Sequence, residues 1–355
     1  MIFHPLRIAA LRRETEDAVS LAFDIPASLR ETFAFRPGQY LTLRTTRDGE
    51  DIRRAYSICA GLDDGALRVA VKHVPGGRFS AHANTALRPG DTLDVMPPEG
   101  RFGHTPDPAA ARLYLGLAAG SGITPILSVI KSILAREPAS RFILLYGSRS
   151  TPHILFRTEL EDLKDRHLGR LSVVHTLSRE TQDIAALNGR LDGAKLGTLL
   201  PGLADPAAID QAFICGPAAM LDDLPTALAA LGTPPDRIQV ERFTPAAPSA
   251  THRPSPPAAD APAAAIATII HDGATHDVPV AEGETVLDAA LRAGLDLPWS
   301  CHGGMCSTCR ARITQGAVRM AVNFSLEPWE TDAGYALTCQ SHPTTDRLTV
   351  DYDHT

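Results

Sequence analysis

The sequence predicts a multidomain protein with an antiparallel β-barrel, an α/β domain that has a doubly wound sheet, and a C-terminal β-grasp domain. Three observations lead to this prediction. Strand-like runs follow one another closely over the first hundred or so residues, strands then alternate with helices, and the last segment holds four of the six cysteines. A chain of 355 residues, 44% of them hydrophobic, is long enough for two or three globular domains of ordinary composition.

The first domain is expected over residues 1–106. Short apolar runs with turn residues between them predict the strands Leu6–Leu11, Val19–Asp24, Tyr40–Arg44, Tyr56–Cys59, Leu67–His73 and Thr92–Met96. One short helix is predicted near Phe79–Asn84. Strands this close together, with few helices, are typical of a small antiparallel barrel.

The second domain is expected over residues 107–243, where strand and helix patterns alternate. The predicted strands are Leu113–Ala118, Phe142–Tyr146, Leu171–Thr176, Phe213–Cys215 and Ile238–Val240. The predicted helices are Pro125–Ala135, Glu159–Arg166 and Met220–Leu231. This alternation favours a parallel doubly wound sheet.

Residues 244–265 predict a linker. The segment contains six prolines among alanine and serine residues, a composition that cannot build a core. In an extended conformation of about 3.1 Å per residue, it would reach up to roughly 60 Å. The linker separates the last domain, residues 266–355, from the rest of the chain.

The last domain has its own pattern of strands and helices. Strands are predicted at 265–271, 275–280, Arg310–Ile313 and Leu348–Tyr352, and helices at 284–291 and Leu326–Ala333. This combination, with a cysteine-bearing loop, suits a β-grasp fold.

The whole formal net charge of −7 lies on the last domain. Residues 266–355 contain 12 acidic and 5 basic residues, whereas residues 1–265 contain 29 of each sign. An acidic surface is common, but charge of one sign also steers encounter with a basic partner surface. No basic patch for nucleic acid is evident, and no apolar run is long enough to span a membrane.

Four cysteines have the spacing of a plant-type [2Fe–2S] site. Cys301, Cys306 and Cys309 follow C-x4-C-x2-C, and Cys339 comes after 29 further residues. Structural zinc usually takes two closely spaced pairs, and a Rieske centre needs two histidines beside its two cysteines. Disulfides would need an oxidising compartment, whereas no secretory signal is visible and a cytoplasmic setting is expected. The spacing therefore predicts a one-electron [2Fe–2S] carrier.

Two motifs in the barrel region suit a bound flavin. Arg54-Ala-Tyr56-Ser57 offers a cation for phosphate, an aromatic ring that can stack and a hydroxyl that can hydrogen-bond. Gly76-Gly77-Arg78-Phe79-Ser80 places glycines just before a short predicted helix, where free N–H groups can bind a pyrophosphate. An ordinary strand end and a plain turn are the alternative interpretations.

Two further motifs suit a nucleotide. Gly120-Ser-Gly122-Ile-Thr124-Pro125 follows a predicted strand and opens a helix, the context that a phosphate-binding loop requires. Cys215-Gly216-Pro217 ends a later strand, and ligands bind at the carboxyl ends of strands in such sheets. For Cys215 alone, and for Cys59, the alternative is a buried core thiol.

Taken together, these motifs resemble the ferredoxin–NADP reductase superfamily. The resemblance implies that Arg54 meets the flavin phosphate, that Tyr56 flanks the isoalloxazine ring and that Ser57 approaches the flavin N5. It further implies that Gly120–Pro125 binds the pyridine nucleotide and that Cys215, followed by Gly216 and Pro217, lies beside the nicotinamide.

The resemblance also bears on which cofactors bind. Ser178 and Arg179 lie just past a predicted strand, where a Ser-Arg pair in this superfamily often holds the adenosine 2′-phosphate, so NADPH is expected and NADH is the alternative. Phe243 resembles the terminal aromatic residue that can cover the flavin, although core packing would explain it equally well. FAD is expected, and FMN is the alternative.

The order of barrel, nucleotide domain, linker and C-terminal ferredoxin resembles the reductase components of multicomponent oxygenases. Among these, the stretches Met320–Glu327 and Leu337–Pro343 are most similar to the reductase subunits of phenylacetyl-CoA epoxidases. The resemblance implies electron flow from NADPH through FAD and the cluster to an oxygenase component. A reductase for another di-iron, Rieske or steroid oxygenase is one alternative, and a non-catalytic flavin and iron–sulfur redox sensor is another.

Overall fold

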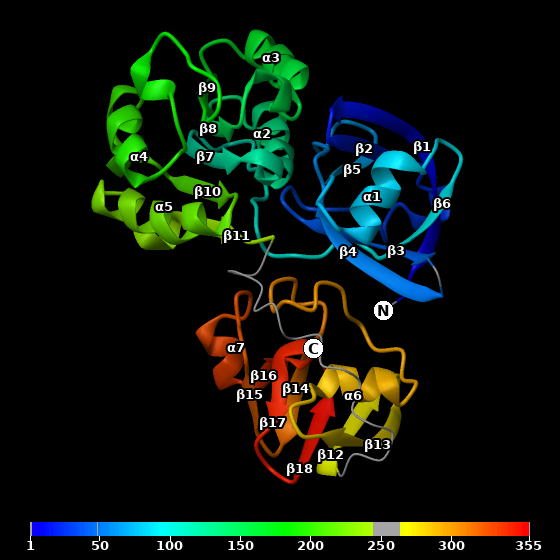
Figure 1. Cartoon of the computed structure of the whole chain (residues 1–355). Helices are drawn as coiled ribbons and strands as arrows, with labels where there is room; N and C mark the ends of the chain where they lie inside the picture. Colours follow the sequence, from blue (N-terminus) through cyan, green and yellow to red (C-terminus); the bar gives the residue numbers. More distant parts are fainter. Residues whose placement is uncertain (1, 48, 244–262, 355) are drawn as a thin grey trace. The chain divides into compact units, whose positions relative to one another are not determined.

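The computed structural model describes residues 2–47, 49–243 and 263–354 (Figure 1). The chain forms two compact units, one over residues 2–243 and the other in the C-terminal part. The predicted linker 244–265 lies outside the described residues except at its end, because strand β12 already begins at Ala263. None of the helices in the described part is long and apolar enough to cross a membrane.

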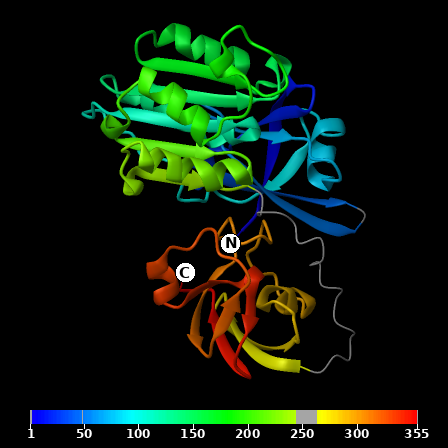
Figure 2. The same ribbon diagram turned by 60° about the vertical axis from the view of Figure 1, so that its left-hand side comes forward.

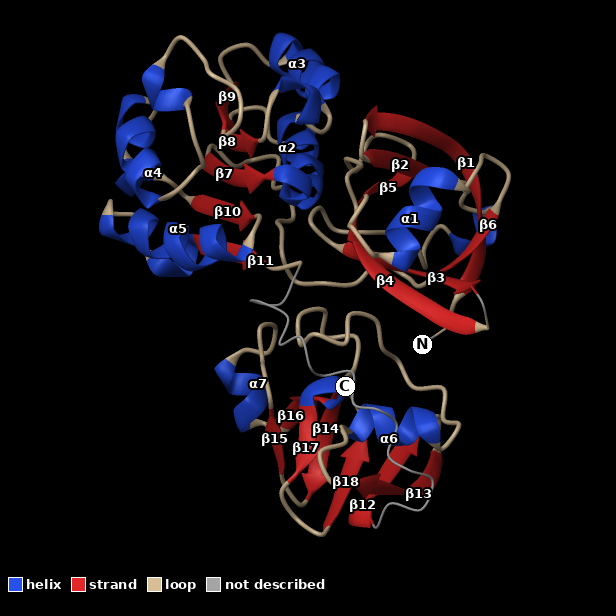
Figure 3. Cartoon of the chain, viewed as in Figure 1, coloured by secondary structure: helices blue, strands red, loops and turns tan. Residues whose placement is uncertain are grey.

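The first part of the larger unit is a six-stranded antiparallel barrel. Its strands are β1 (His4–Thr15), β2 (Ala18–Phe23), β3 (Tyr40–Arg47), β4 (Glu50–Ser57), β5 (Leu67–Lys72) and β6 (Thr92–Val95), in the order β4-β3-β6-β1-β2-β5. A bridge between Ile58 and Val69 joins the two outer strands and closes the barrel. Helix α1 (Arg78–Thr85) packs against β4 and β5 (Figure 3).

The second part of the larger unit is an α/β domain with five parallel strands. These are β7 (Leu113–Ala119), β8 (Arg141–Ser148), β9 (Leu171–Leu177), β10 (Gln211–Cys215) and β11 (Ile238–Glu241), in the order β11-β10-β7-β8-β9. Its helices are α2 (Ile123–Arg136), α3 (Arg157–Arg166), α4 (Gly193–Leu199) and α5 (Ala218–Ala230).

Successive residues of these strands face opposite sides of the sheet, as the strand period of two requires. Tyr114 and Phe142 belong to the apolar core beneath α2 and α3, whereas Leu115 and Ile143 belong to the core beneath α4 and α5. The sheet therefore lies between two layers of helices (Figure 2). This is the predicted doubly wound architecture.

The C-terminal unit has a five-stranded mixed sheet. Its strands β12 (Ala263–His271), β13 (Ala274–Ala281), β14 (Arg310–Gln315), β16 (Tyr335–Leu337) and β18 (Arg347–Asp351) have the order β13-β12-β18-β14-β16. A separate pair consists of β15 (Val318–Met320) and β17 (Ser341–Pro343), and the helices are α6 (Val286–Arg292) and α7 (Pro328–Asp332). Val286 and Leu287 of α6 pack into the core of this sheet, as a β-grasp fold requires.

Three details of the sequence prediction were wrong. Strand β4 spans Glu50–Ser57 rather than Tyr56–Cys59, because its charged first half pairs with β3 in a hairpin. Helix α4, capped by Asp192, was not predicted. Strands β15, β16 and β17 were also missed, because a run of three residues is too short to show a period.

Candidate functional site

The flavin motif lies at the end of β4. The register with β3 sets Ser57 opposite Tyr40, and Ser57 is buried while Arg54 is exposed. The Tyr56 ring lies 5.4 Å from the Phe79 ring, centroid to centroid. Burial raises the pKa of Tyr56 well above its usual range, so its hydroxyl stays neutral.

The second barrel motif forms the start of α1. Gly77 is the N-cap residue of this eight-residue helix and lacks a side-chain cap. The buried Ser80 hydroxyl donates to the Gly77 carbonyl at 3.1 Å and accepts from the Val74 amide at 3.1 Å, which shapes the turn. Because Phe79 contacts Tyr56, the structure brings the two predicted flavin motifs together.

The nucleotide loop and the Cys-Gly-Pro segment also meet. Gly120–Gly122 forms one 3-10 turn between β7 and α2, and the Thr124 hydroxyl donates to the Ser121 carbonyl at 2.9 Å. A Cβ atom on Gly122 would lie 2.1 Å from the Cys215 carbonyl oxygen, so only glycine allows this approach. Pro125 is buried in the first turn of α2.

Cys215 ends β10 and is fully buried, and Pro217 is the N-cap residue of α5, with Gly216 between them. Burial raises the pKa of the Cys215 thiol well above its ordinary value, and Glu241 raises it further. Desolvation in turn raises the pKa of Glu241 to about 8. Glu241 was not predicted as a site residue, because only the pairing of β10 with β11 brings it beside Cys215.

The predicted 2′-phosphate residues Ser178 and Arg179 follow the carboxyl end of β9. Ser178 and Arg179 are both exposed, and the Arg179 amide donates to the Arg149 carbonyl at 2.7 Å. The Arg149 side chain pairs with Asp17 of the barrel at 3.1 Å. Within the described part of the chain, the fully buried Thr176 hydroxyl has no hydrogen-bond partner.

Phe243 is partly buried and packs against the apolar core that includes Phe213 and Cys215. The described residues end there on this side of the linker. Core packing of Phe243 is thus observed.

The four predicted cluster ligands gather in the C-terminal unit. All six cysteines of the chain are free thiols. The thiol of Cys301 interacts with that of Cys306, and the thiol of Cys309 interacts with that of Cys339. Cys306, Cys309 and Cys339 are each at most 9% exposed. Hydrogen bonds, chiefly from Cys306, lower the pKa of Cys301 to about 6, whereas interaction with Cys301 raises the pKa of Cys306.

The loop around these thiols has an unusual backbone. His302 (φ 49°) and Ser307 (φ 56°) adopt left-handed conformations that residues other than glycine rarely accept. The Gly303 amide donates to the Cys301 sulfur at 3.3 Å, and the Gln340 side-chain amide approaches the Cys339 sulfur at 3.6 Å. Four gathered thiols with amide donors fit a [2Fe–2S] cluster, whose sulfurs accept such hydrogen bonds.

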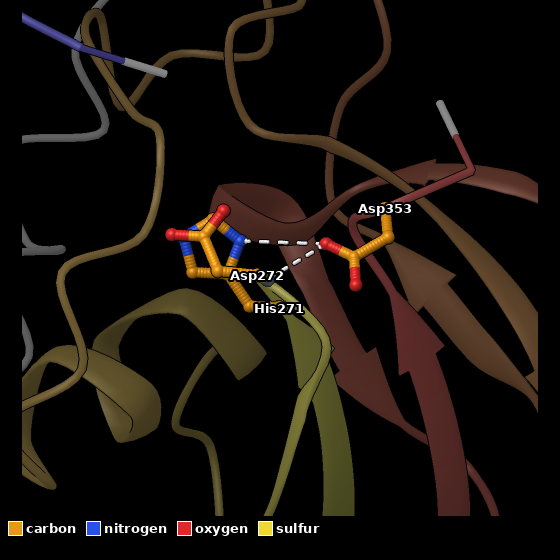
Figure 4. A group of neighbouring side chains, drawn as sticks. All are labelled: His271, Asp272 and Asp353. Carbon is orange, nitrogen blue, oxygen red and sulfur yellow. Dashed lines mark hydrogen bonds and ion pairs between the residues drawn. The ribbon is translucent and has the colours of Figure 1, made fainter.

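One other group of possible ligand atoms is present among the described residues. His271, Asp272 and Asp353 bring their ligand atoms within 4.8 Å of one another (Figure 4). The Asp353 carboxylate, however, accepts the amides of Asp272 and Gly273 at 2.8 and 2.9 Å. Asp353 therefore caps the turn between β12 and β13.

Comparison with known families agrees with these three sites. An oxidoreductase FAD-binding domain matches residues 5–104, an oxidoreductase NAD-binding domain matches residues 117–225, and a 2Fe-2S iron-sulfur cluster binding domain matches residues 269–344. Each match encloses the motifs described above for that cofactor. The fold and its sites therefore define an NAD(P)H-dependent flavin and iron–sulfur oxidoreductase.

The chain belongs to the family of three-domain reductase components that serve oxygenases. It is 46% identical over 353 residues to a 1,2-phenylacetyl-CoA epoxidase subunit of Escherichia coli (strain K12), covering 99% of this chain and 98% of that protein. It is 34% identical to the ferredoxin reductase component of 3-ketosteroid-9-alpha-monooxygenase of Rhodococcus rhodochrous, covering 98% and 96%.

Solved structures show the same fold. Phthalate dioxygenase reductase, described as a modular structure for electron transfer from pyridine nucleotides to [2Fe–2S], matches with a TM-score of 0.59 at 22% identity, over 98% of both chains. An intact type IV self-sufficient cytochrome P450 monooxygenase matches with a TM-score of 0.71 at 26% identity. That match covers 98% of this chain but only 41% of the larger one.

Proposed function

We propose that this reductase donates electrons from NADPH to a phenylacetyl-CoA epoxidase. The observation that carries the proposal is the 46% identity to a protein of such an epoxidase over nearly the full length of both chains. The 34% identity to a steroid monooxygenase reductase makes a steroid oxygenase the second candidate. The acidic C-terminal domain, with 12 acidic and 5 basic residues, favours a partner with a basic docking face.

The barrel residues would hold the flavin. The exposed Arg54 guanidinium would bind the flavin phosphate, and the N-terminus of α1 at Gly77 and Ser80 would bind the pyrophosphate. Tyr56 would flank the ring system, and the buried Ser57 hydroxyl would hydrogen-bond to the atom that accepts the hydride. A bound flavin supplies the conversion between a two-electron hydride and single electrons.

The α/β domain would hold the nucleotide. Gly120, Gly122, Thr124 and Pro125 shape the phosphate loop, and Gly216 and Pro217 flank the nicotinamide. The buried, neutral Cys215 thiol would exclude water from the transfer site, and Phe243, which packs against the core that includes Cys215, would be the aromatic residue that covers the flavin. Cys301, Cys306, Cys309 and Cys339 would ligate a [2Fe–2S] cluster, which supplies one-electron transfer when bound. Cluster ligation would require these four cysteines to remain reduced, and the cytoplasm is a compartment that keeps thiols reduced.

Arg179, assisted by Ser178, would select NADPH through its 2′-phosphate, because a guanidinium binds this dianion strongly. We expect Arg179→Ala to weaken NADPH binding roughly 10-fold or more, given about 1.5–3 kcal/mol for a charged hydrogen bond, and to leave NADH binding unchanged. Arg166→Ala, at the far end of α3, serves as the control. Equal affinity of the wild type for both nucleotides would refute the NADPH preference.

Reconstitution tests the proposed partner. The purified protein, NADPH and phenylacetyl-CoA epoxidase should give rapid oxidation of phenylacetyl-CoA, and a steroid oxygenase should give little product. More product with the steroid oxygenase than with phenylacetyl-CoA epoxidase would instead identify the protein as a reductase for a steroid oxygenase. If NADPH reduces neither the flavin nor an artificial one-electron acceptor, the protein is a sensor rather than a reductase.

A further inference from the structure

The two cofactor motifs of the larger unit are joined through a short stretch of barrel backbone. Residues 58–64 directly follow the flavin motif, and α2 directly follows the nucleotide loop. The Ser128 hydroxyl on α2 donates to the Ala60 carbonyl at 2.6 Å, and the Ser132 hydroxyl accepts from the Leu62 amide at 3.1 Å. Both serines are fully buried and lie one helical turn apart, so the barrel segment follows one face of α2.

Ionic contacts extend this junction. Lys131, on the same face of α2, pairs with Asp64 of the barrel and, at 2.6 Å, with Glu159 of α3. Both carboxylate oxygens of Glu159 lie 2.7 Å from one guanidinium nitrogen of Arg68 on β5. The Arg68 and Glu159 side chains are each only 17% exposed, so solvent screens this pair weakly.

The surroundings of Glu159 favour the ionised, negatively charged form of its carboxyl group. Burial acts to raise the pKa of Glu159, but Arg68 and Lys131 together hold it below the ordinary value. Arg68 is tied back to the flavin strand, because its carbonyl accepts the Cys59 amide at 2.8 Å. These ion pairs and hydrogen bonds therefore connect α3 and α2 to Cys59, which lies two residues after Ser57 of the flavin motif.

Close packing between the barrel segment 58–64 and α2 limits their movement relative to each other. A Cβ atom on Gly61 would lie 2.7 Å from the Cβ atom of Lys131, so the barrel backbone touches α2 directly. Cys59 and Ala70 of the barrel also belong to the apolar core beneath α2. Packing at native density resists small displacements.

We propose that Ser128 and Glu159 are positioning residues for hydride transfer, holding the flavin motif at a set distance from the nucleotide loop. Ser57 lies three residues before Ala60, and Thr124 lies one helical turn before Ser128. A short covalent and hydrogen-bonded path between the two cofactor motifs thus crosses the Ser128–Ala60 contact. Misplacement by about 1 Å slows a transfer between held reactants roughly 100-fold. The proposal concerns flavin reduction and holds for either nucleotide and any electron acceptor.

The test compares Ser128→Ala and Glu159→Gln with the control Asp63→Asn. Asp63 pairs with Arg136 on the same face of α2, but these two side chains are 52% and 45% exposed. Stopped-flow reduction of the full-length holoprotein by NADPH gives the limiting rate and the nucleotide Kd. A fluorescence titration gives the flavin Kd, and calorimetry of the flavin-free protein reports whether barrel and α/β domain unfold together.

We expect the limiting rate to fall roughly 10-fold in Ser128→Ala and up to about 100-fold in Glu159→Gln. Both Kd values should stay within about twofold, and the barrel and the α/β domain should unfold less cooperatively than in the wild type. The control should match the wild type in every measurement. If Glu159→Gln fails to fold, Ser128→Ala decides the question, because it removes one hydroxyl and no charge.

An unchanged limiting rate in Ser128→Ala overturns the proposal. An equal loss in Asp63→Asn also overturns it, since that would reflect the surface of α2 in general. A fall in rate that tracks a matching rise in the flavin Kd would assign these residues to flavin binding instead.

Discussion

Cys215 lies directly beside Glu241, because the register of the parallel strands β10 and β11 pairs these two residues. Both side chains stand at the carboxyl ends of their strands, where such sheets bind ligands. Desolvation raises both pKa values, to about 8 for the partly buried Glu241 and well above the ordinary thiol value for the fully buried Cys215. At neutral pH this end of the sheet therefore carries two protonated, uncharged groups.

This pair predicts a pH-dependent stability. The pKa of Glu241 is about 8 in the folded chain against 4.5 in an unfolded one, so the folded state binds the extra proton between these values. The stabilising effect of protonated Glu241 is complete below about pH 4.5 and is lost as the pH rises through 8. Urea unfolding of the flavin-free protein should show this decline, and Glu241→Gln should flatten it. Parallel pH profiles for both proteins would contradict the assignment.

Ser57→Ala should slow flavin reduction without removing the flavin. Loss of one hydrogen bond worth about 0.5–1.5 kcal/mol corresponds to a fall of roughly 2- to 12-fold in the limiting rate. Ser20→Ala is the matched control, since Ser20 is equally buried in the barrel but donates to Glu14 at 2.6 Å. Stopped-flow absorbance measures both variants. Equal effects would show that Ser57 acts only through the packing of the barrel.

Cys306→Ser should abolish the iron–sulfur absorption and electron paramagnetic resonance signal. Flavin reduction by NADPH should remain within about twofold of the wild-type rate, because the cluster residues belong to a separate compact unit. Cys59→Ala, which removes a buried thiol from the barrel, should leave the cluster intact. Zinc in place of iron in the purified wild-type protein would rule out the [2Fe–2S] assignment.

Glu330→Ala should destabilise the C-terminal unit by about 3–5 kcal/mol, the range for breaking a buried ion pair. The Glu330 side chain is fully buried, pairs with Arg310 next to the predicted ligand Cys309, and accepts the Glu327 amide at 3.0 Å. Chemical denaturation followed by cluster absorption measures the loss. Asp277→Ala, which removes an exposed hydrogen bond to Thr268, should change stability by no more than about 0.5 kcal/mol.

Much of the architecture was predictable because its signals are local. The barrel strands, the α/β alternation and the ferredoxin strands come from runs of four or more residues with a clear period, and most lie within a few residues of their predicted bounds. Strand β4 was misplaced, because residues such as Asp51 and Arg53 appear loop-like until the hairpin with β3 pairs them. Sequence periodicity carries no information about that partner strand.

The sequence alone predicted the cluster cysteines and the flavin and nucleotide loops, because their chemistry depends on residue types at short, regular spacings, and the three matching domain models enclose these motifs. The folded chain was needed to place Glu241 beside Cys215 and to anchor Ala60 on Ser128. The partners in each pair are far apart in the chain. The register of parallel strands brings the first pair together, and packing of the barrel against a helix brings the second pair together. Such contacts arise from packing of the whole unit, so no local pattern encodes them.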